Sequence, residues 1–239
     1  MKIRPLCDCD FSEHVLYSSF LLLMGVGYLM ALSFLYTSFE GIDGKPGLSV
    51  EDIADDYYGN RSGSRLETAI RGPMSGYIDK ASRDKIVTWL GAGATKNDYE
   101  KIVLPIISER CLGCHSPQSG LDIPNLSTYE TIQEVTAIDT GMSLHSLMKV
   151  SHIHLFGVGL VLLSVGMIFR RVVMRTWLKA TLIVLPFAAI FVDILAWFLT
   201  KWDPIYAYII VFSGAVLGLS LAGQIFSSLY QMWFTKKAD

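Results

Sequence analysis

Four long apolar stretches limit what this chain can fold into more than any other feature. They lie at about residues 15–36, 152–169, 178–199 and 205–230, and the second is expected to have a lead-in from Leu144. About 20 mostly apolar residues in a helix are enough to cross the hydrocarbon core of a bilayer. The composition agrees, because 51% of the 239 residues are hydrophobic and only 18% are charged. We therefore expect an all-α protein built on a four-helix transmembrane bundle.

Basic residues gather on one side of the four predicted spans. They are Lys2, Arg4, Arg170, Arg171, Arg175, Lys179, Lys236 and Lys237. The link between the third and fourth spans carries Lys201 alone. Because Lys and Arg are retained on the cytoplasmic side, both termini are predicted to be cytoplasmic. Residues 40–151 then lie on the outer side of the membrane.

The first apolar stretch has an alternative interpretation as a cleaved signal peptide, since basic residues precede it. Its length exceeds the usual 7–15 residues of a signal core, and Asp8, Asp10 and Glu13 come before it. An uncleaved anchor is therefore favoured. Cys7 and Cys9 would then face a reducing compartment as free thiols, with lipidation or metal binding as alternatives.

A CxxCH pentapeptide lies within the segment predicted to be outside the membrane. It consists of Cys111, Leu112, Gly113, Cys114 and His115. Two thiols at this spacing can add to the two vinyl groups of a heme, and the histidine then reaches the iron. A zinc site is the alternative, but it needs two further ligands, and the remaining cysteines lie far away at the N-terminus. The motif predicts one covalently attached heme c.

Short helices are expected around this motif. One begins at the capping residue Ser49, a second covers Ser82–Leu90, and a third runs from Asn97 into the motif. Apolar residues with a proline (103–107) precede the motif, and Leu-Ser-Thr-Tyr-Glu (126–130) follows as a predicted turn. This pattern, over about residues 99–135, resembles the cytochrome c-like modules of bacterial membrane and periplasmic proteins. The resemblance is specific at the CxxCH alone, and it implies a small all-helical monoheme domain.

These observations predict a cytochrome c-like extramembrane domain inserted between the first and second spans. With so few residues, its core would be thin without heme. The expected parts are a cytoplasmic N-terminus (1–14), transmembrane helix 1 (15–37), a periplasmic heme c domain (38–151), transmembrane helices 2–4 (152–231) and a cytoplasmic C-terminus (232–239). The predicted location is the inner (cytoplasmic) membrane of a bacterium.

A heme iron bound by His115 has a second axial position, and residues 141–154 are rich in possible ligands. In order of preference they are His152, His154, His145, Met148 and Met142. In a helix, His145, Met148 and His152 would share one face. His154 would lie on nearly the opposite face and could serve another purpose. The alternative is that each histidine is only a polar residue at the membrane interface.

Asp193 is the one acidic residue within the four apolar stretches. An ionisable group inside a bilayer is costly and is a candidate functional residue. Together with His154 it could accept protons from a quinol. The alternative is a structural hydrogen bond to a serine or tyrosine of a neighbouring helix. A b-type heme held by two histidines is excluded within this chain, because the third and fourth stretches contain none.

The favoured function is a membrane-bound monoheme cytochrome c that transfers electrons within a respiratory or oxidoreductase complex. The first alternative is a quinol-oxidising subunit with a site near His154 and Asp193, and the second is a heme-based sensor or assembly protein. Expected partners are other membrane subunits, the lipid bilayer and a soluble electron carrier or quinol. The net charge of −2, with no basic cluster, argues against nucleic acid. No complete set of catalytic residues is evident.

Overall fold

The computed structural model describes residues 4–121 and 123–235, and within them the regular elements are helices. The chain divides into two compact units. The membrane unit consists of Met1–Ser38 and Ser143–Asp239, and the inserted unit consists of Phe39–Met142. The second unit is thus an insertion between two parts of the first, as the sequence predicts.

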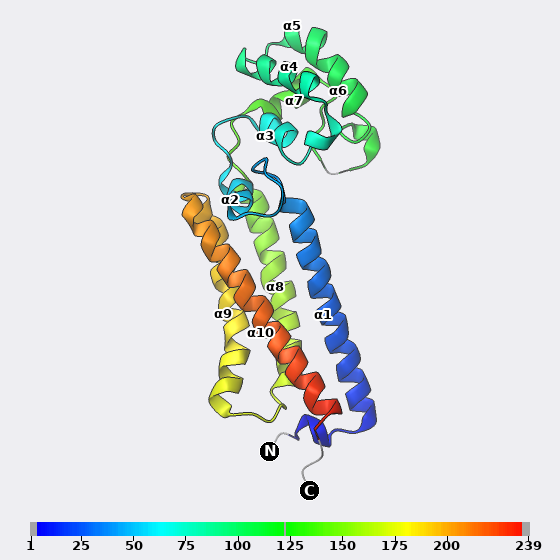
Figure 1. The fold of residues 1–239 in the computed structure, drawn as a ribbon, viewed down its shortest axis with the longest axis vertical. Coiled ribbons are helices and arrows are strands. Elements are labelled where there is room, and N and C mark those ends of the chain that lie inside the picture. Colours follow the sequence, from blue (N-terminus) through cyan, green and yellow to red (C-terminus); the bar gives the residue numbers. More distant parts are fainter. Residues whose placement is uncertain (1–3, 122, 236–239) are drawn as a thin grey trace. The chain divides into compact units, whose positions relative to one another are not determined.

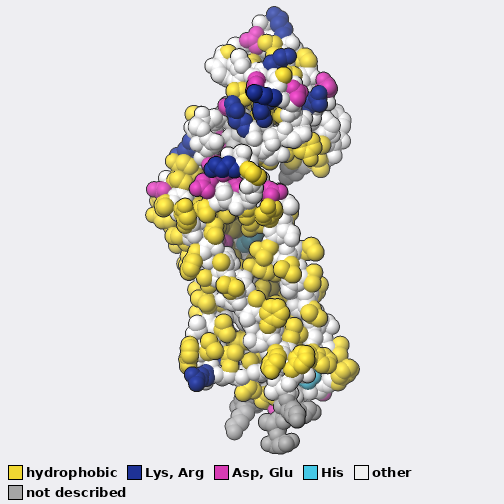
Figure 2. All heavy atoms as spheres, viewed as in Figure 1, with side chains coloured by type: hydrophobic (Ala, Val, Ile, Leu, Met, Phe, Trp, Pro, Cys, Tyr) yellow, Lys and Arg dark blue, Asp and Glu magenta, His cyan; other side chains and the backbone are white. Residues whose placement is uncertain are grey.

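The membrane unit contains four long helices, α1 (Phe11–Phe39), α8 (Leu144–Phe169), α9 (Thr176–Thr200) and α10 (Ala207–Trp233) (Figure 1). All four are long and apolar enough to cross a membrane, which confirms the predicted spans. Hydrophobic side chains cover most of the visible surface of this unit (Figure 2). In water such a surface would drive aggregation, whereas lipid solvates it.

Helices α8, α9 and α10 pack on one another, whereas α1 is more loosely attached. Among the described residues of α1, only Ser18 and Leu21 are buried. Its N-terminal end is held by polar contacts. Arg171, between α8 and α9, donates to Tyr17 Oη over 2.8 Å, and the Trp233 indole donates to Ser18 Oγ over 2.8 Å. The C-terminal half of α1 is therefore the part of the bundle that is held least tightly by other helices.

The described residues of the inserted unit contain seven α-helical or π-helical segments. They are α2 (Val50–Tyr58), α3 (Arg65–Arg71), α4 (Lys80–Gly91), α5 (Lys96–Asp98), the π-helix Tyr99–Val103, α6 (Leu104–Arg110) and α7 (Tyr129–Thr136). The three helices expected from the sequence are confirmed, with Ser49 capping α2 through a capping box. Residues 126–130 are not a simple turn, because Thr128 caps α7. Isoleucines, valines, Trp89 and Tyr99 from these helices form a shared core.

The structure ends the inserted unit earlier than the sequence predicts. The sequence-based boundary lies at residue 151, but the unit ends at Met142 and α8 starts at Leu144. Ser143 marks the helix start, because its side chain accepts a hydrogen bond from the backbone N–H of Ser146. His145, Lys149, His152 and His154 make the first three turns of α8 polar, so the apolar stretch itself begins only near residue 152.

Two glycines allow close contact between the segment that follows α2 and the segment that precedes α8. Gly59 and Gly141 have φ of +85° and +66°, and their Cα atoms face each other's backbone. A Cβ on Gly141 would overlap the Tyr57 carbonyl. We expect Gly141→Ala to lower the free energy of unfolding by at least about 1–2 kcal/mol, the cost of a left-handed backbone for an L-residue. Thermal unfolding of the full chain measures this, and Gly91→Ala, with open space around it, should have little effect.

Asp55 on α2 makes the inserted unit sensitive to pH. Partial burial raises the pKa of its carboxyl, and the negative charge of Asp139 adds to this. A carboxyl whose pKa is higher in the folded state favours folding at low pH and loses this contribution as pH rises through the folded-state pKa. We expect Asp55→Asn to raise the melting temperature at neutral pH and to leave it unchanged near pH 3. Glu134→Gln, which removes an exposed carboxylate of the inserted unit that is not among the charges acting on Asp55, is the control.

Candidate heme site

The CxxCH motif lies on the wall of a cavity in the inserted unit. The cavity has a volume of about 440 Å³ and is lined mainly by apolar side chains. Leu66 and Ile70 of α3 form one part of its wall, and Leu121, Ile123, Pro124 and Leu126 form another. Met74, Tyr77 and Ile78 line it between α3 and α4. An apolar cavity next to two thiols and an imidazole is the environment that a bound macrocycle requires.

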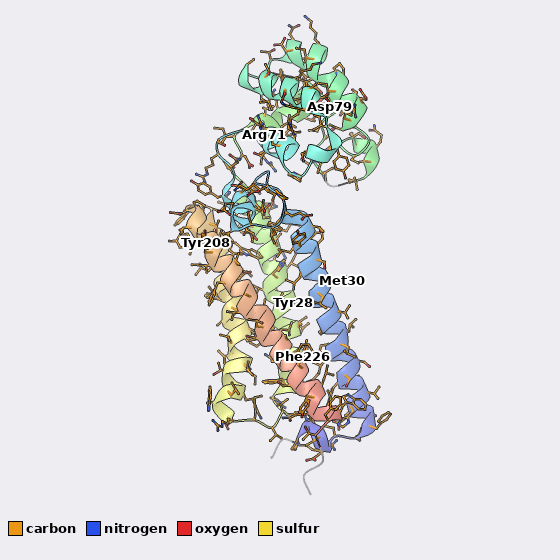
Figure 3. The ribbon with its side chains drawn as sticks, viewed as in Figure 1. Tyr28, Met30, Arg71, Asp79, Tyr208 and Phe226 are labelled. Carbon is orange, nitrogen blue, oxygen red and sulfur yellow. The ribbon has the colours of Figure 1, made fainter. Side chains whose placement is uncertain are left out.

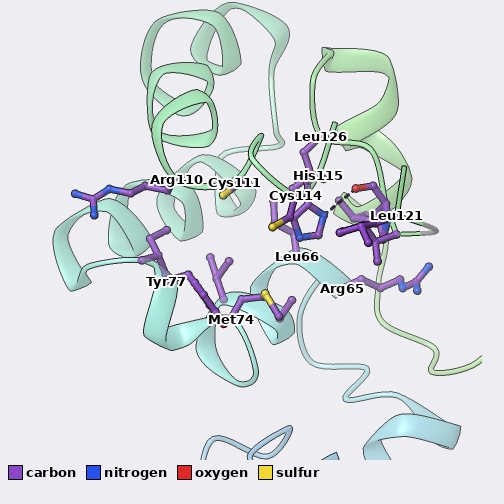
Figure 4. A pocket seen from close by; sticks show the side chains of 16 residues that line it. Arg65, Leu66, Met74, Tyr77, Arg110, Cys111, Cys114, His115, Leu121 and Leu126 are labelled. Carbon is purple, nitrogen blue, oxygen red and sulfur yellow. Dashed lines mark hydrogen bonds between the residues drawn. The ribbon is translucent and has the colours of Figure 1, made fainter. Parts of the chain in front are cut away.

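Helix α6 delivers the motif to this wall. The helix ends at Arg110, and the N–H of Cys111 donates to the Ile107 carbonyl over 2.8 Å. The N–H of His115 then donates to the Cys111 carbonyl over 2.8 Å, which folds the motif into a compact turn. This turn puts Cys114 and His115 on the cavity side (Figure 4). The position of the motif is therefore set by backbone hydrogen bonds.

One ring nitrogen of His115 is already bound to the protein. Its Nδ1 lies 2.8 Å from the Pro124 carbonyl oxygen, which can only accept a hydrogen bond. The Nδ1 atom therefore carries the proton, and Nε2 keeps its lone pair. Metal-binding histidines usually donate their second N–H to a carbonyl or carboxylate in this way. The loop after the motif thus orients the His115 ring through Nδ1 and leaves Nε2 as the atom that could bind a metal.

Both cysteines of the motif are free thiols. Burial raises the pKa of the Cys111 thiol, so it is protonated and uncharged at neutral pH. In the described part of the chain, no three His, Cys, Asp or Glu side chains come together in a group that could hold a metal ion. The zinc alternative therefore has no additional ligands, whereas two thiols, one prepared imidazole and an apolar cavity fit a heme.

The five residues predicted as second iron ligands are not among those that line the cavity. His145, Met148, His152 and His154 belong to α8, and Met142 is the last residue of the inserted unit. On α8, His145, Met148 and His152 are exposed, while His154 faces Trp197 of α9. The predicted separation of His154 from the other three is thus confirmed. An iron ligand from this group stays a prediction.

Met74 lines the cavity instead, and sequence reasoning missed it. Its side chain and that of His115 point into the same space from opposite sides (Figure 4). Gly72 and Pro73 end α3 and make the turn that carries Met74 there. A methionine directly after a helix-ending Gly-Pro was a detectable signal. The sequence-based prediction instead favoured the three histidines of residues 144–154.

Inside the membrane unit, Asp193 of α9 is buried and accepts a hydrogen bond from Ser213 Oγ of α10 over 2.9 Å. His154 and Trp197 stand edge to face, with ring centroids 5.3 Å apart. The two residues predicted as a proton-accepting pair thus belong to one polar cluster in this unit. Gln224 is accounted for by packing, as its amide donates to the Leu182 carbonyl over 2.7 Å.

Residues 127–239 match a family model described as a transmembrane helical domain. Neither a curated protein nor a solved structure matches the chain. The matched segment contains α7 to α10 but neither α1 nor the CxxCH motif. Together, the match and the four apolar helices make the chain a multi-pass membrane protein.

Proposed function

We propose that the chain is a membrane-bound monoheme cytochrome c that acts as an electron-transfer subunit of a respiratory or oxidoreductase complex. The observation that carries this proposal is the apolar cavity with Cys111, Cys114 and His115 on its wall. A cytochrome c-like module inserted into a membrane bundle accounts for this cavity and for the division into two units. A heme supplies reversible one-electron chemistry when it is bound.

Different residues around the cavity would hold different parts of a heme. Cys111 and Cys114 supply the two thioether links, and Nε2 of His115 is the iron ligand. Arg65 and Arg110 also line the cavity, and their charges suit the two carboxylates that a heme carries. Apolar side chains such as Leu66 exclude water from the space between them, which favours a well-defined potential.

Met74 is proposed as the second iron ligand. Its thioether sulfur is a soft ligand that heme iron accepts, and Met74 lines the same cavity as His115, so it could hold the iron together with that histidine. Met142, the predicted candidate that belongs to the same unit, is not among the described lining residues. A methionine ligand gives a higher potential than a second histidine, which suits a carrier that passes electrons on to an oxidising partner.

Exposed apolar side chains around the cavity support a role in electron transfer to another protein. Tyr77 is 71% exposed and Leu121 is 56% exposed, and both line the cavity. An exposed apolar patch of this size provides a small contact area, which is typical of transient redox complexes. The proposed partners are other membrane subunits and a soluble carrier, and four spans exceed what tethering one small domain requires. The bacterial inner membrane, with the heme on its periplasmic side, is the proposed location.

Purification in mild detergent from the native membrane tests this proposal. We expect one covalent heme per chain, and co-migration with a second redox subunit that reduces or oxidises it. The heme is quantified by its absorption after transfer to alkaline pyridine. A pure chain without heme, or a heme protein that migrates as a lone monomer with no redox partner, would contradict the proposal.

A further inference from the structure

A polar cluster inside the membrane unit is separate from the heme site. Each of the four long helices contributes to it. Its members, which we call the intramembrane cluster, are Tyr28 of α1, His154 of α8, Asp193 and Trp197 of α9, and Ser213 of α10. Placing polar side chains inside a helix bundle surrounded by lipid costs free energy. A cluster with members on all four helices is therefore a candidate functional site.

Asp193 is the acidic centre of the cluster. Its Oδ1 atom lies 2.9 Å from Ser213 Oγ. That hydroxyl also lies 2.7 Å from the carbonyl oxygen of Ile209 and 3.1 Å from that of Ile210. One hydroxyl hydrogen cannot serve three acceptors at once, so Ser213 only partly satisfies the carboxylate. The Trp197 side chain also acts on this carboxylate as a hydrogen-bond donor. A carboxylate offers about four acceptor sites, so Asp193 retains capacity to accept a hydrogen bond from a ligand.

His154 is a second acceptor in the cluster. Its Nδ1 lies 2.9 Å from the Val150 carbonyl oxygen on its own helix, so the proton of the neutral ring is on Nδ1. The lone pair of Nε2 then remains for another donor. The His154 ring stands edge to face on Trp197, one helical turn along α9 from Asp193. The imidazole and the carboxylate also interact electrostatically.

Tyr28 brings α1 to the same place. Its hydroxyl lies against Gly218 of α10, at a point where any Cβ would overlap it, and Figure 3 shows Tyr28 on the inner side of α1. The side chain interacts electrostatically with Asp193. Within the face of the membrane unit that Figure 2 shows, a histidine and an acidic side chain lie at the bottom of a hollow. Beside this place, α1 packs only loosely on the other three long helices.

We propose that the intramembrane cluster binds the headgroup of a quinol. A quinol is lipophilic and carries two hydroxyls on opposite sides of a flat ring. Asp193 and Nε2 of His154 accept one hydrogen bond each, and the Trp197 indole offers an aromatic contact for the ring. Asp193 lies about 10 Å from the C-terminal end of α9, by a rise of 1.5 Å per residue. That depth suits a polar headgroup whose tail remains in the lipid.

Quenching of tryptophan fluorescence tests this inference on the full chain in lipid nanodiscs. The probe is a short-tailed naphthoquinol, kept reduced, and its oxidised form is titrated separately. We expect saturable quenching that Trp197→Phe largely removes. His154→Phe and Asp193→Asn should each weaken binding about tenfold or more, as the loss of a hydrogen bond to a buried or charged acceptor predicts.

The matched control is His152→Phe, which makes the same change on the exposed side of α8. It should leave the dissociation constant within about twofold of that of the unmodified protein, a change too small for a lost hydrogen bond. Melting temperatures show whether each variant is folded, and His154→Phe decides the matter if Asp193→Asn fails to fold. Quenching without saturation, or equal affinity in folded His154→Phe and His152→Phe proteins, would overturn the inference and leave a structural cluster. The heme absorption of the same samples reports the proposed function independently.

Discussion

Replacing Cys111 and Cys114 together by alanine is expected to produce a chain that carries no covalent heme. The physical reason is that the two thiols are the only atoms of the cavity wall able to form thioether bonds, and the described residues of the chain offer no second pair beside this cavity. Heme-dependent peroxidase staining after denaturing electrophoresis should fall to background. Mass spectrometry should show the loss of one heme mass in addition to the two substitutions.

The loss of heme should also destabilise the inserted unit. Without a ligand, the cavity of about 440 Å³ leaves its apolar walls without contacts. A ligand that binds only the folded state stabilises it, so its removal lowers the melting temperature. The matched control is Cys7→Ala with Cys9→Ala, two buried thiols of the membrane unit. That pair should leave the heme stain unchanged. An unchanged stain in the Cys111 and Cys114 variant would show that the motif is not the attachment site.

The membrane-spanning architecture could be predicted from the sequence because lipid imposes a simple rule. A span must be long and apolar, and its backbone must be satisfied within the helix. All four spans were therefore found. The start of α1 was placed too late, at 15 instead of Phe11, whereas the second span was placed at 152 with a lead-in from Leu144, where α8 starts. Polar residues such as Glu13 and His145 occupy these first turns, where the rule no longer applies.

The inserted unit was harder to predict, because its helices are short and their ends depend on tertiary contacts. Helices α2 and α4 carry clear caps at Ser49 and Asp79. Helix α3 has seven residues and is stabilised mainly by burying Leu66 and Ile70 in the core. Ser64 caps it by accepting a hydrogen bond from the Glu67 N–H, but a helix this short still depends on tertiary packing. Since α3 leads directly to Met74, missing the helix also meant missing the residue.

The candidate site shows the same division between local and non-local information. Cys111, Cys114 and His115 are adjacent in sequence, so their chemistry is visible as a motif. The partner of His115 across the cavity comes from a different segment, and nothing local links Met74 to it. The histidines and methionines close to a membrane span made residues 142–154 the predicted source of the second iron ligand. The structure offers a candidate that is already at the cavity.

Met74→Leu is expected to change the heme iron more than any other single substitution outside the CxxCH. Leucine keeps the volume and apolar character of the side chain but has no sulfur, so the fold should be retained. The iron would lose its proposed second ligand, and carbon monoxide should then bind the reduced protein rapidly. Optical spectra of the purified protein, with and without carbon monoxide, measure this change.

Met74→His should instead restore a six-coordinate iron and lower its reduction potential, on the order of 0.1 V or more, because imidazole favours the ferric state relative to a thioether. Spectroelectrochemical titration gives the two midpoint potentials. The controls are Met148→Leu and His152→Phe, which alter the candidates predicted on α8 and should leave both spectrum and potential unchanged. If His152→Phe opens the iron to carbon monoxide and Met74→Leu does not, the second ligand comes from α8. Met74 would then line the cavity without binding the iron.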